Sequence, residues 1–223
     1  MKLSIEINQL NKYVINQLNV FFNDGLLIEN NELIKFQQEA INRLEMSFVH
    51  IKNHYFRSNN KPYFNHLNSD HYSMYLYILS NIVWEHSKDS RLPTKIFLLN
   101  KALHGIDVFY TVKLPKIFLF CHPLGTVLGN AKYSDYFIVY QNCTVGGDSM
   151  GKYPKFEQGV LLYSGVSVIG DSLIGTNTIF GAQSSIVSSE VKSDSLVLQK
   201  YPNNRILKNK SNVKEKFCSA KFI

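Results

Sequence analysis

The stretch from residue 168 to residue 187, VIGDSLIGTNTIFGAQSSIV, repeats one short pattern and decides the fold. In it the pairs Ile169-Gly170, Ile174-Gly175 and Phe180-Gly181 recur at steps of five and six residues, and Ile186 comes six residues after Phe180. One inward aliphatic residue per hexad, with a small residue beside it, is typical of a solenoid whose coils are triangular prisms. Each coil then buries its aliphatic side chains against the coils above and below it.

The residues before Asp107 follow a helical period instead. Apolar side chains recur on one helical face in two segments. They are Ile34, Ile41, Leu44, Phe48 and Ile51 in the first segment, and Leu76, Leu79, Ile82 and Val83 in the second. A third helix is predicted from Ser90 as N-cap, with Pro93 in its first turn, to Gly105 at its end. Residues 56–70, rich in Asn and His, are predicted to be a loop between helices.

After Asp107 the chain consists of short β-branched runs separated by Gly, Asn and Asp. The fold class is therefore mixed α and β in separate regions: a helical domain over residues 1–105, a β-helix over 106–210, and a basic C-terminal tail over 211–223. A sandwich of irregular short strands is the alternative for the second region. We favour the β-helix because alternation with a period of two is poor there.

The charge is concentrated at the C-terminus. The chain has 24 basic and 17 acidic residues, a net charge of +7, and residues 200–223 hold seven of the basic residues against one acid. Such a tail suits a nucleotide, an anionic polymer or a membrane surface, and a simply solvated tail is equally compatible. No recognition element accompanies the charge, so we do not predict nucleic-acid binding.

The sequence also indicates in which cellular compartment the protein is expected. No apolar window is long enough for a transmembrane segment, and residues 1–11 lack the pattern of a secretory signal. Cys121, Cys143 and Cys218 have neither disulfide-framework nor metal-ligand spacing. We therefore expect a cytoplasmic protein with reduced thiols, no transmembrane segment and no metal site.

Several motifs in a fixed order point to one family. They are Ile106-Asp107-Val108, Cys121-His122, Val127-Leu128-Gly129, Cys143-Thr144-Val145-Gly146-Gly147, Lys152-Tyr153-Pro154-Lys155, the stretch 168–187, and Arg205-Ile206-Leu207. From about Tyr77 to Lys210 the chain resembles the serine acetyltransferases and, more broadly, the hexapeptide-repeat acyltransferases. The resemblance implies a left-handed parallel β-helix behind N-terminal helices, acetyl-CoA as co-substrate, and a homotrimer or a dimer of trimers.

The resemblance also assigns a catalytic pair. In the family a His is the general base, and an Asp fifteen residues earlier holds its other ring nitrogen; here the spacing matches His122 and Asp107. A neutral imidazole can remove the proton of a hydroxyl as it attacks a thioester, and the carboxylate fixes the tautomer. A turn histidine before Pro123, satisfied by the backbone, is the alternative for His122.

The cofactor-binding residues are likewise implied by the resemblance. Small residues that lie along the coil edges leave room for the pantetheine arm, and basic residues near the C-terminus meet the phosphates. The matching positions are Gly146, Gly147, Ser164, Gly165, Gly181, Ala182, Lys200, Arg205 and Lys208. Tight corner geometry explains the glycines equally well.

The acceptor site departs from the family pattern. Serine acetyltransferases hold the amino acid with an acid before the catalytic His, an Arg-His pair, and an acid in the helical domain. Here Cys121 and Lys152-Tyr153 stand at the first two places, and Asp70 is a candidate for the third. Because a thiol cannot pair with an ammonium group, we expect a saccharide acceptor as in capsule or lipopolysaccharide modification, with Cys121, Lys152 and Tyr153 as substrate-binding residues. The alternative is acetylation of L-serine.

A different class of function stays open at this point. A β-helix can act as a non-catalytic scaffold for oligomerisation or binding. Replacement of His122 distinguishes the two, because an enzyme loses its rate while keeping its fold.

Overall fold

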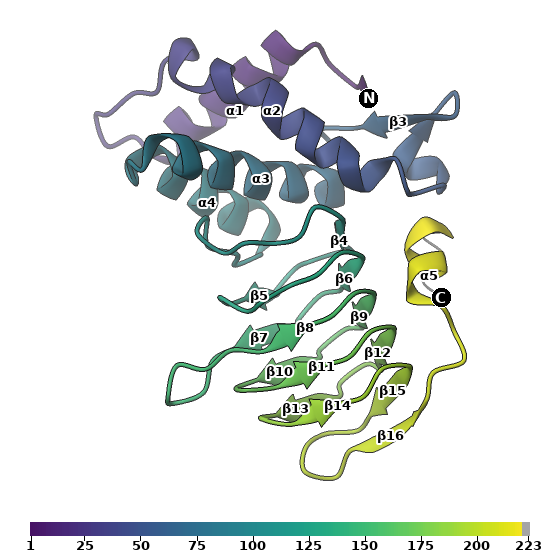
Figure 1. Cartoon of the computed structure of the whole chain (residues 1–223). Coiled ribbons are helices and arrows are strands. Elements are labelled where there is room, and N and C mark those ends of the chain that lie inside the picture. The colour runs from purple at the N-terminus through teal and green to yellow at the C-terminus, as the bar shows by residue number, and fades with distance from the viewer. Residues whose placement is uncertain (220–223) are drawn as a thin grey trace.

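The computed structural model describes residues 1–219 and has two main parts, a helical part and a solenoid (Figure 1). Its helices are α1 (Ile7–Phe21), α2 (Asn30–Phe48), α3 (Ser69–Ser87), α4 (Arg91–His104) and α5 (Val213–Ser219), with a 3-10 turn at His54–Phe56. Within residues 1–219, no helix combines the length and the apolar composition that crossing a bilayer requires.

The helical part packs around α3. Almost every side chain of α3 between His71 and Val83 is buried, because α2, α4 and the first coil cover it from several sides. The predicted helices correspond to α2, α3 and α4, and Gly105 ends α4 in a left-handed conformation with φ 62°. Helix α1 was not predicted from the sequence, although a capping box joins Glu6 and Gln9 at its start.

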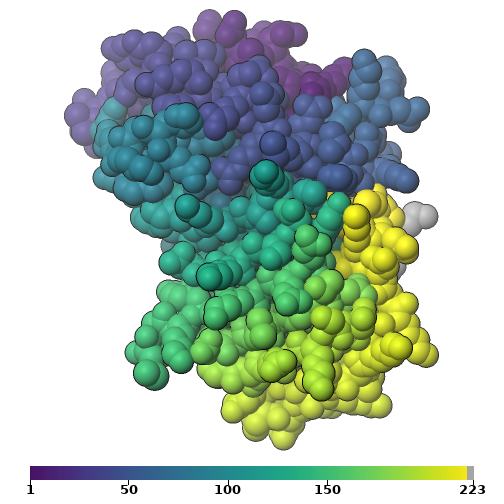
Figure 2. All heavy atoms as spheres, viewed as in Figure 1, coloured from purple at the N-terminus to yellow at the C-terminus, as the bar shows by residue number. Residues whose placement is uncertain are grey.

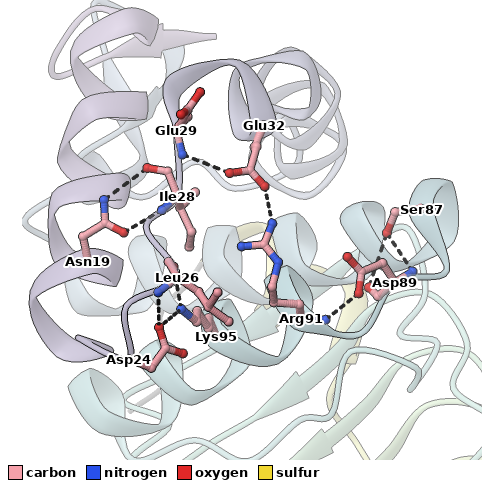
Figure 3. Close-up of polar contacts among 10 residues, drawn as sticks. All are labelled: Asn19, Asp24, Leu26, Ile28, Glu29, Glu32, Ser87, Asp89, Arg91 and Lys95. Carbon is pink, nitrogen blue, oxygen red and sulfur yellow. Dashed lines mark hydrogen bonds and ion pairs between the residues drawn. The ribbon is translucent and has the colours of Figure 1, made fainter.

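The connection between α1 and α2 is fixed to α4 by polar contacts (Figure 3). The Lys95 ammonium donates to Asp24 Oδ1 at 2.8 Å and to the carbonyl oxygen of Leu26 at 3.0 Å. Asn19 accepts from the N–H of Ile28 and donates to its carbonyl. A loop held by several such contacts sits rigidly on the helix beneath it.

Residues 56–70 are more ordered than the predicted loop. They contain β2 (Arg57–Ser58) and β3 (Lys61–Phe64), which form a hairpin, and β3 also pairs with the N-terminal strand β1 (Lys2–Leu3). The pairing of β1 with β3 joins strands that are far apart in sequence. Strands of two to four residues give little periodicity to detect.

The second part is a solenoid of about four turns of left-handed parallel β-helix. Its strands are β4 (Phe118–Phe120), β5 (Val127–Leu128), β6 (Phe137–Val139), β7 (Thr144–Gly146), β8 (Lys155–Phe156), β9 (Val160–Leu162), β10 (Ser167–Ile169), β11 (Leu173–Ile174), β12 (Thr178–Phe180), β13 (Ser185–Val187), β14 (Glu190–Val191), β15 (Ser195–Leu198) and β16 (Arg205–Lys208). The coil strands pair in parallel in three sheets, ordered β5-β7-β10-β13, β8-β11-β14 and β4-β6-β9-β12-β15. This confirms the hexapeptide prediction and excludes the sandwich.

The two parts share one continuous core. Tyr77 of α3 lies against the rings of Phe118 and Phe120 in the first coil, with ring centroids 5.7 and 6.3 Å apart. Its hydroxyl donates to the carbonyl oxygen of Val112 at 2.7 Å and accepts from the N–H of Leu114 at 3.0 Å. These hydrogen bonds satisfy the buried Tyr77 hydroxyl within the interface between α3 and the first coil, so α3 covers that end of the solenoid.

The C-terminal segment returns along the solenoid to the helical part. Strand β16 pairs antiparallel with β15, and α5 then lies beside the edge of the first coils (Figures 1 and 2). Val213 and Phe217 of α5 are fully buried, and the N–H of Lys52 donates to the carbonyl oxygen of Cys218 at 2.7 Å. The alternative of a solvated tail is thus wrong for α5, because its apolar side chains are buried against the rest of the protein. Residues 220–223 of the predicted tail lie outside the described residues.

Candidate active site

His122 stands on a bulge at one corner of the first coil. Cys121 and Leu124 stack on Tyr140 and Gln141, which are consecutive residues of the next coil. His122 and Pro123 therefore have no counterpart there and are pushed outward. The imidazole is 77% exposed and its backbone φ is 49°, so the ring projects from the corner toward solvent. A protruding imidazole is accessible to a substrate, as a general base must be.

The carboxylate beside His122 belongs to Asp70, from the helical part. Asp70 lies in the first turn of α3, where Asn68 caps the helix by accepting from the N–H groups of Asp70 and His71. Asp70 Oδ1 accepts from the backbone N–H of His122 at 2.9 Å and lies 3.7 Å from Nδ1 of its ring. Burial raises the pKa of Asp70, and His122 opposes that rise. The structure thus places a partly buried carboxyl group next to the proposed base.

Asp107, the predicted partner of His122, makes a different contact. Its Oδ2 accepts from the Lys101 ammonium at 2.6 Å, and its backbone pairs with Val127, beyond the His122 bulge. The fifteen-residue spacing between Asp107 and His122 could not predict this ion pair, because Lys101 reaches Asp107 from α4, a helix outside the repeat. A role for Asp107 behind the imidazole stays a prediction.

The three residues predicted to bind the acceptor occupy different places. Cys121 is buried, and burial raises the pKa of its thiol well above the usual value, so it stays neutral. Lys152 is exposed and its ammonium is 3.1 Å from Asp171 Oδ2. The Tyr153 ring lies over Gly147, where an added Cβ would come within 3.0 Å of it. Of the three, Cys121 adjoins the base directly.

Two of the predicted cofactor residues, Ser164 and Ala182, stack on each other in one column of the coils. Leu124 stacks on Gln141, which stacks on Ser164 and then on Ala182, so small residues follow below the His122 bulge. Gly165 has φ 72°, which accounts for glycine at that corner. Gly181 has no room for a Cβ, which would lie 2.6 Å from Leu198. Gly146 is similarly close to Ile169. Packing thus explains the glycines, while Ser164 and Ala182 leave an open edge.

The basic residues lie at the other end of the solenoid. Lys200, Arg205 and Lys208 are all exposed, and the last two stand on β16. Figure 1 places β16 at the end opposite β4, far along the coils from the His122 bulge. Residues 1–219 contain no group of three His, Cys, Asp or Glu side chains suited to hold a metal ion.

Lys101 was not among the site residues predicted from the sequence. Its signal was the position in the last turn before Gly105, on a helix end that faces the first coil. Asp70 was recognised only as a candidate. Its N-cap residue, Asn68, and the following apolar run mark a helix start, but only the tertiary structure brings that start to His122.

A helical cap on a left-handed hexapeptide β-helix, with a projecting His at the first coil, defines the class of hexapeptide-repeat acyltransferase-like proteins. Comparison with known proteins narrows the class. The chain is 31% identical over 111 residues to the serine acetyltransferase of Synechococcus elongatus (strain ATCC 33912 / PCC 7942 / FACHB-805), covering 48% of this chain and 45% of that protein. It spans about half the length of the curated relatives it matches. No family model matches the chain.

Solved structures agree with the fold. Serine acetyltransferase from Brucella abortus strain S19 superposes with a TM-score of 0.69 at 17% identity, covering 92% of this chain and 85% of that one. The same enzyme in complex with coenzyme A gives 0.69 at 15% identity, covering 94% and 84%. These findings confirm the resemblance to the serine acetyltransferase-like hexapeptide-repeat family.

The expected saccharide acceptor is wrong. The similar proteins in both comparisons are serine acetyltransferases, which favours the alternative reading. The physical reason lies in Asp70. The saccharide expectation rested on the absence of an acid at position 121, yet the Asp70 carboxylate of α3 lies 2.9 Å from the backbone nitrogen of His122, 52 residues away in sequence.

Proposed function

We propose that this protein transfers the acetyl group of acetyl-CoA to the hydroxyl of L-serine. The observation that carries the proposal is the partly buried Asp70 carboxylate beside the projecting His122, since an anion next to a base suits an acceptor that bears both an ammonium group and a hydroxyl. The serine acetyltransferases to which the chain is similar support the same acceptor.

In the proposed reaction, His122 takes the proton of the serine hydroxyl as its oxygen attacks the thioester carbonyl. The C–S bond then breaks, the thiolate of CoA leaves, and the imidazolium returns the proton to the sulfur. The products are O-acetyl-L-serine and CoA. Asp70 holds the ammonium group of serine and orients the backbone of the His122 bulge through its hydrogen bond. Asp107 remains the proposed second partner of the base.

For acetyl-CoA, the open edge below the bulge supports a position along the coils. Ser164 and Ala182 lie on that edge, with Ala182 exposed. In this arrangement the thioester lies at His122 and the pantetheine arm follows the edge. The phosphates approach the basic residues Lys200, Arg205 and Lys208 at the far end.

Assembly forms part of the proposal. The resemblance implies a trimer with sites between protomers, and exposed apolar side chains on the solenoid surface support self-association. Leu124, Val127, Met150 and Leu173 are each more than 40% exposed. Light scattering of the purified protein checks the mass, and a monomer at assay concentration contradicts this part.

The test is a CoA-release assay with acetyl-CoA and L-serine, using His122→Gln. We expect the variant to lose about 10²- to 10⁴-fold in kcat with an unchanged circular dichroism spectrum. His86→Gln is the matched control, because His86 is an exposed histidine on α3 that contacts Glu39, and it should retain full activity. Absence of CoA release with the wild-type protein and L-serine would overturn the proposal. Retained activity in His122→Gln removes His122 as the base.

A further inference from the structure

Two tyrosines stack below the residue that precedes the proposed base. Strands β4, β6 and β9 pair in parallel, and the residues that follow them are Cys121, Tyr140 and Tyr163. Equivalent residues of neighbouring coils lie about 4.8 Å apart. Figure 1 shows the three strands one below the other, with α3 above β4. Tyr140 therefore lies one coil below Cys121 and Tyr163 two coils below it, and the reaction as described so far gives neither tyrosine a role.

The two tyrosines are held firmly in place. Their ring centroids are 5.3 Å apart, with the planes inclined at 41°. Each residue is half-buried, but the hydroxyl oxygen of Tyr140 is buried, so that end of the ring points into the protein. The backbone is held as well: the Thr126 hydroxyl donates to the carbonyl oxygen of Tyr140 at 2.6 Å, and the Cys143 thiol donates to that of Tyr163 at 3.1 Å. Because packed rings lose contacts when they move apart, this pair forms a rigid wall.

The tyrosine wall lies beside the Asp70 carboxyl group. Asp70 Oδ1 accepts from the backbone N–H of His122 at 2.9 Å, so the carboxyl group lies at the peptide that joins Cys121 to His122. Burial raises the pKa of Tyr140, and Cys121 and Asp70 add to that rise. Burial also raises the pKa of Tyr163, with a further contribution from Cys121. Because such electrostatic effects weaken with distance, both phenol groups lie near the proposed acceptor site.

A rigid wall at this place affects how long an acceptor can be. The proposed acceptor is held at two points, with its ammonium group at Asp70 and its hydroxyl at His122. An amino acid with one more methylene group, such as L-homoserine, carries the same groups on a longer chain and needs more room between those points. One methylene group changes kcat/KM by about 10- to 200-fold where the pocket cannot adapt. A wall that cannot move aside therefore selects the shorter acceptor.

We propose that Tyr140, supported by Tyr163, is a specificity-determining residue that limits the acceptor to the length of L-serine. The inference rests on the proposed function and names how that site selects its substrate. Asp70 and His122 determine which groups the acceptor carries, and the tyrosine wall determines how long the chain between those groups is. Tyr140 needs only the volume of its ring for this role, and no charge or hydrogen bond to the acceptor.

The experiment measures CoA release with L-homoserine and with L-serine and takes the ratio of the two kcat/KM values. Tyr140→Ala should raise this ratio by about 10-fold or more, because it makes room for the extra methylene group. Tyr140→Phe should leave the ratio unchanged, since the ring stays. Tyr163→Ala should raise it less, because it removes only the support of Tyr140. The ratio comes from a single preparation, so it does not depend on how much of the variant is folded.

Tyr136→Ala is the matched control, because Tyr136 is a half-buried tyrosine at the other end of β6, where its ring meets those of His50 and Phe217. We expect it to leave the ratio unchanged, and an equal rise there overturns the inference. An unchanged ratio in Tyr140→Ala also overturns it, and Tyr163→Ala decides in the same way if Tyr140→Ala does not fold.

Two results with the wild-type protein separate this inference from the proposed function. If the wild-type protein acetylates L-homoserine as well as L-serine, the inference fails and the proposed function stands. If it does not acetylate L-serine, the proposed function itself fails.

Discussion

The two main parts of the molecule contribute different chemistry to one site. The solenoid supplies the exposed His122 on a corner where the first coil has extra residues, and small residues along an open edge. The helical part supplies charge: Asp70, at the start of α3, lies beside His122, and Lys101, at the end of α4, pairs with Asp107. Repeated coils leave few positions free to vary, because every inward residue packs on its neighbours. Acceptor selection can change more freely in the helical cap.

The sharpest way to separate the two contributions is to neutralise the two carboxylates in turn. We expect Asp70→Asn to lower kcat/KM for L-serine by about 10²- to 10³-fold, because the ammonium group of serine loses its partly buried partner. Asp107→Asn should lower kcat/KM less, because the Asp70 carboxylate still lies 3.7 Å from His122 Nδ1. Steady-state kinetics on both variants check this. A larger loss in Asp107→Asn than in Asp70→Asn would assign the main role to the acid predicted from the sequence.

Core truncations compare the solenoid with the segment that returns along it. Phe180→Ala, in β12, should lower the free energy of unfolding by about 3–5 kcal/mol, because a fully buried ring is lost from the coil stack. Phe217→Ala, in α5, should cost less, since a short terminal helix can detach locally without unfolding the coils. Urea denaturation measures both. Equal losses would mean that α5 unfolds together with the solenoid.

Acid should affect the helical part before the solenoid. His71 is buried among the rings of Phe48, Phe56 and Phe64, and burial lowers its pKa to about 3. The folded-state pKa is below the unfolded value of about 6.5, so the unfolded chain binds the proton first as pH falls. The stability contributed by the neutral imidazole is complete above pH 6.5 and is lost progressively down to about pH 3.

The expected loss from His71 is about 2 kcal/mol at pH 5, at 1.36 kcal/mol for each unit below the unfolded pKa. His104, whose pKa burial lowers to about 4, adds a change of the same sign. Thermal denaturation between pH 7 and pH 4 measures the slope. A flat profile in that range contradicts the prediction, and His86→Gln, at an exposed position, should leave the slope unchanged.

Glycine replacements give the smallest expected difference between the parts. Gly125 and Gly25 both have positive φ, 73° and 79°. A Cβ at Gly125 would meet Asn142 Oδ1 at 2.3 Å, whereas nothing lies within 4 Å at Gly25. Gly25→Ala should cost about 1 kcal/mol from backbone strain, and Gly125→Ala about 1–2 kcal/mol more, because Asn142 must shift. Equal melting temperatures of the two variants would show that the Asn142 side chain shifts at little energetic cost.

The repeat determined the solenoid from the sequence by itself. Residues such as Ile174 and Phe180 recur at one period because each stacks on its own counterpart in the next coil, Ile174 on Val191 and Phe180 on Val197. Local pattern and tertiary contact therefore carry the same information. Helices α2, α3 and α4 were readable for a similar reason, since one apolar face repeats along each of them. Helix α1 and the β2–β3 hairpin were missed, because short or polar elements leave little periodicity.

What only the tertiary structure decided is which charges lie beside His122 and Asp107. Asp70 and Lys101 belong to helix ends whose position depends on how α3 and α4 dock on the first coil, and no spacing in the chain encodes that docking. The sequence located His122 through the motif Cys121-His122 and its fifteen-residue spacing from Asp107, which the family resemblance assigns to a catalytic base. An electrostatic neighbour is a matter of distance in space, and charges far apart in sequence can meet only once the core that Tyr77 joins has formed.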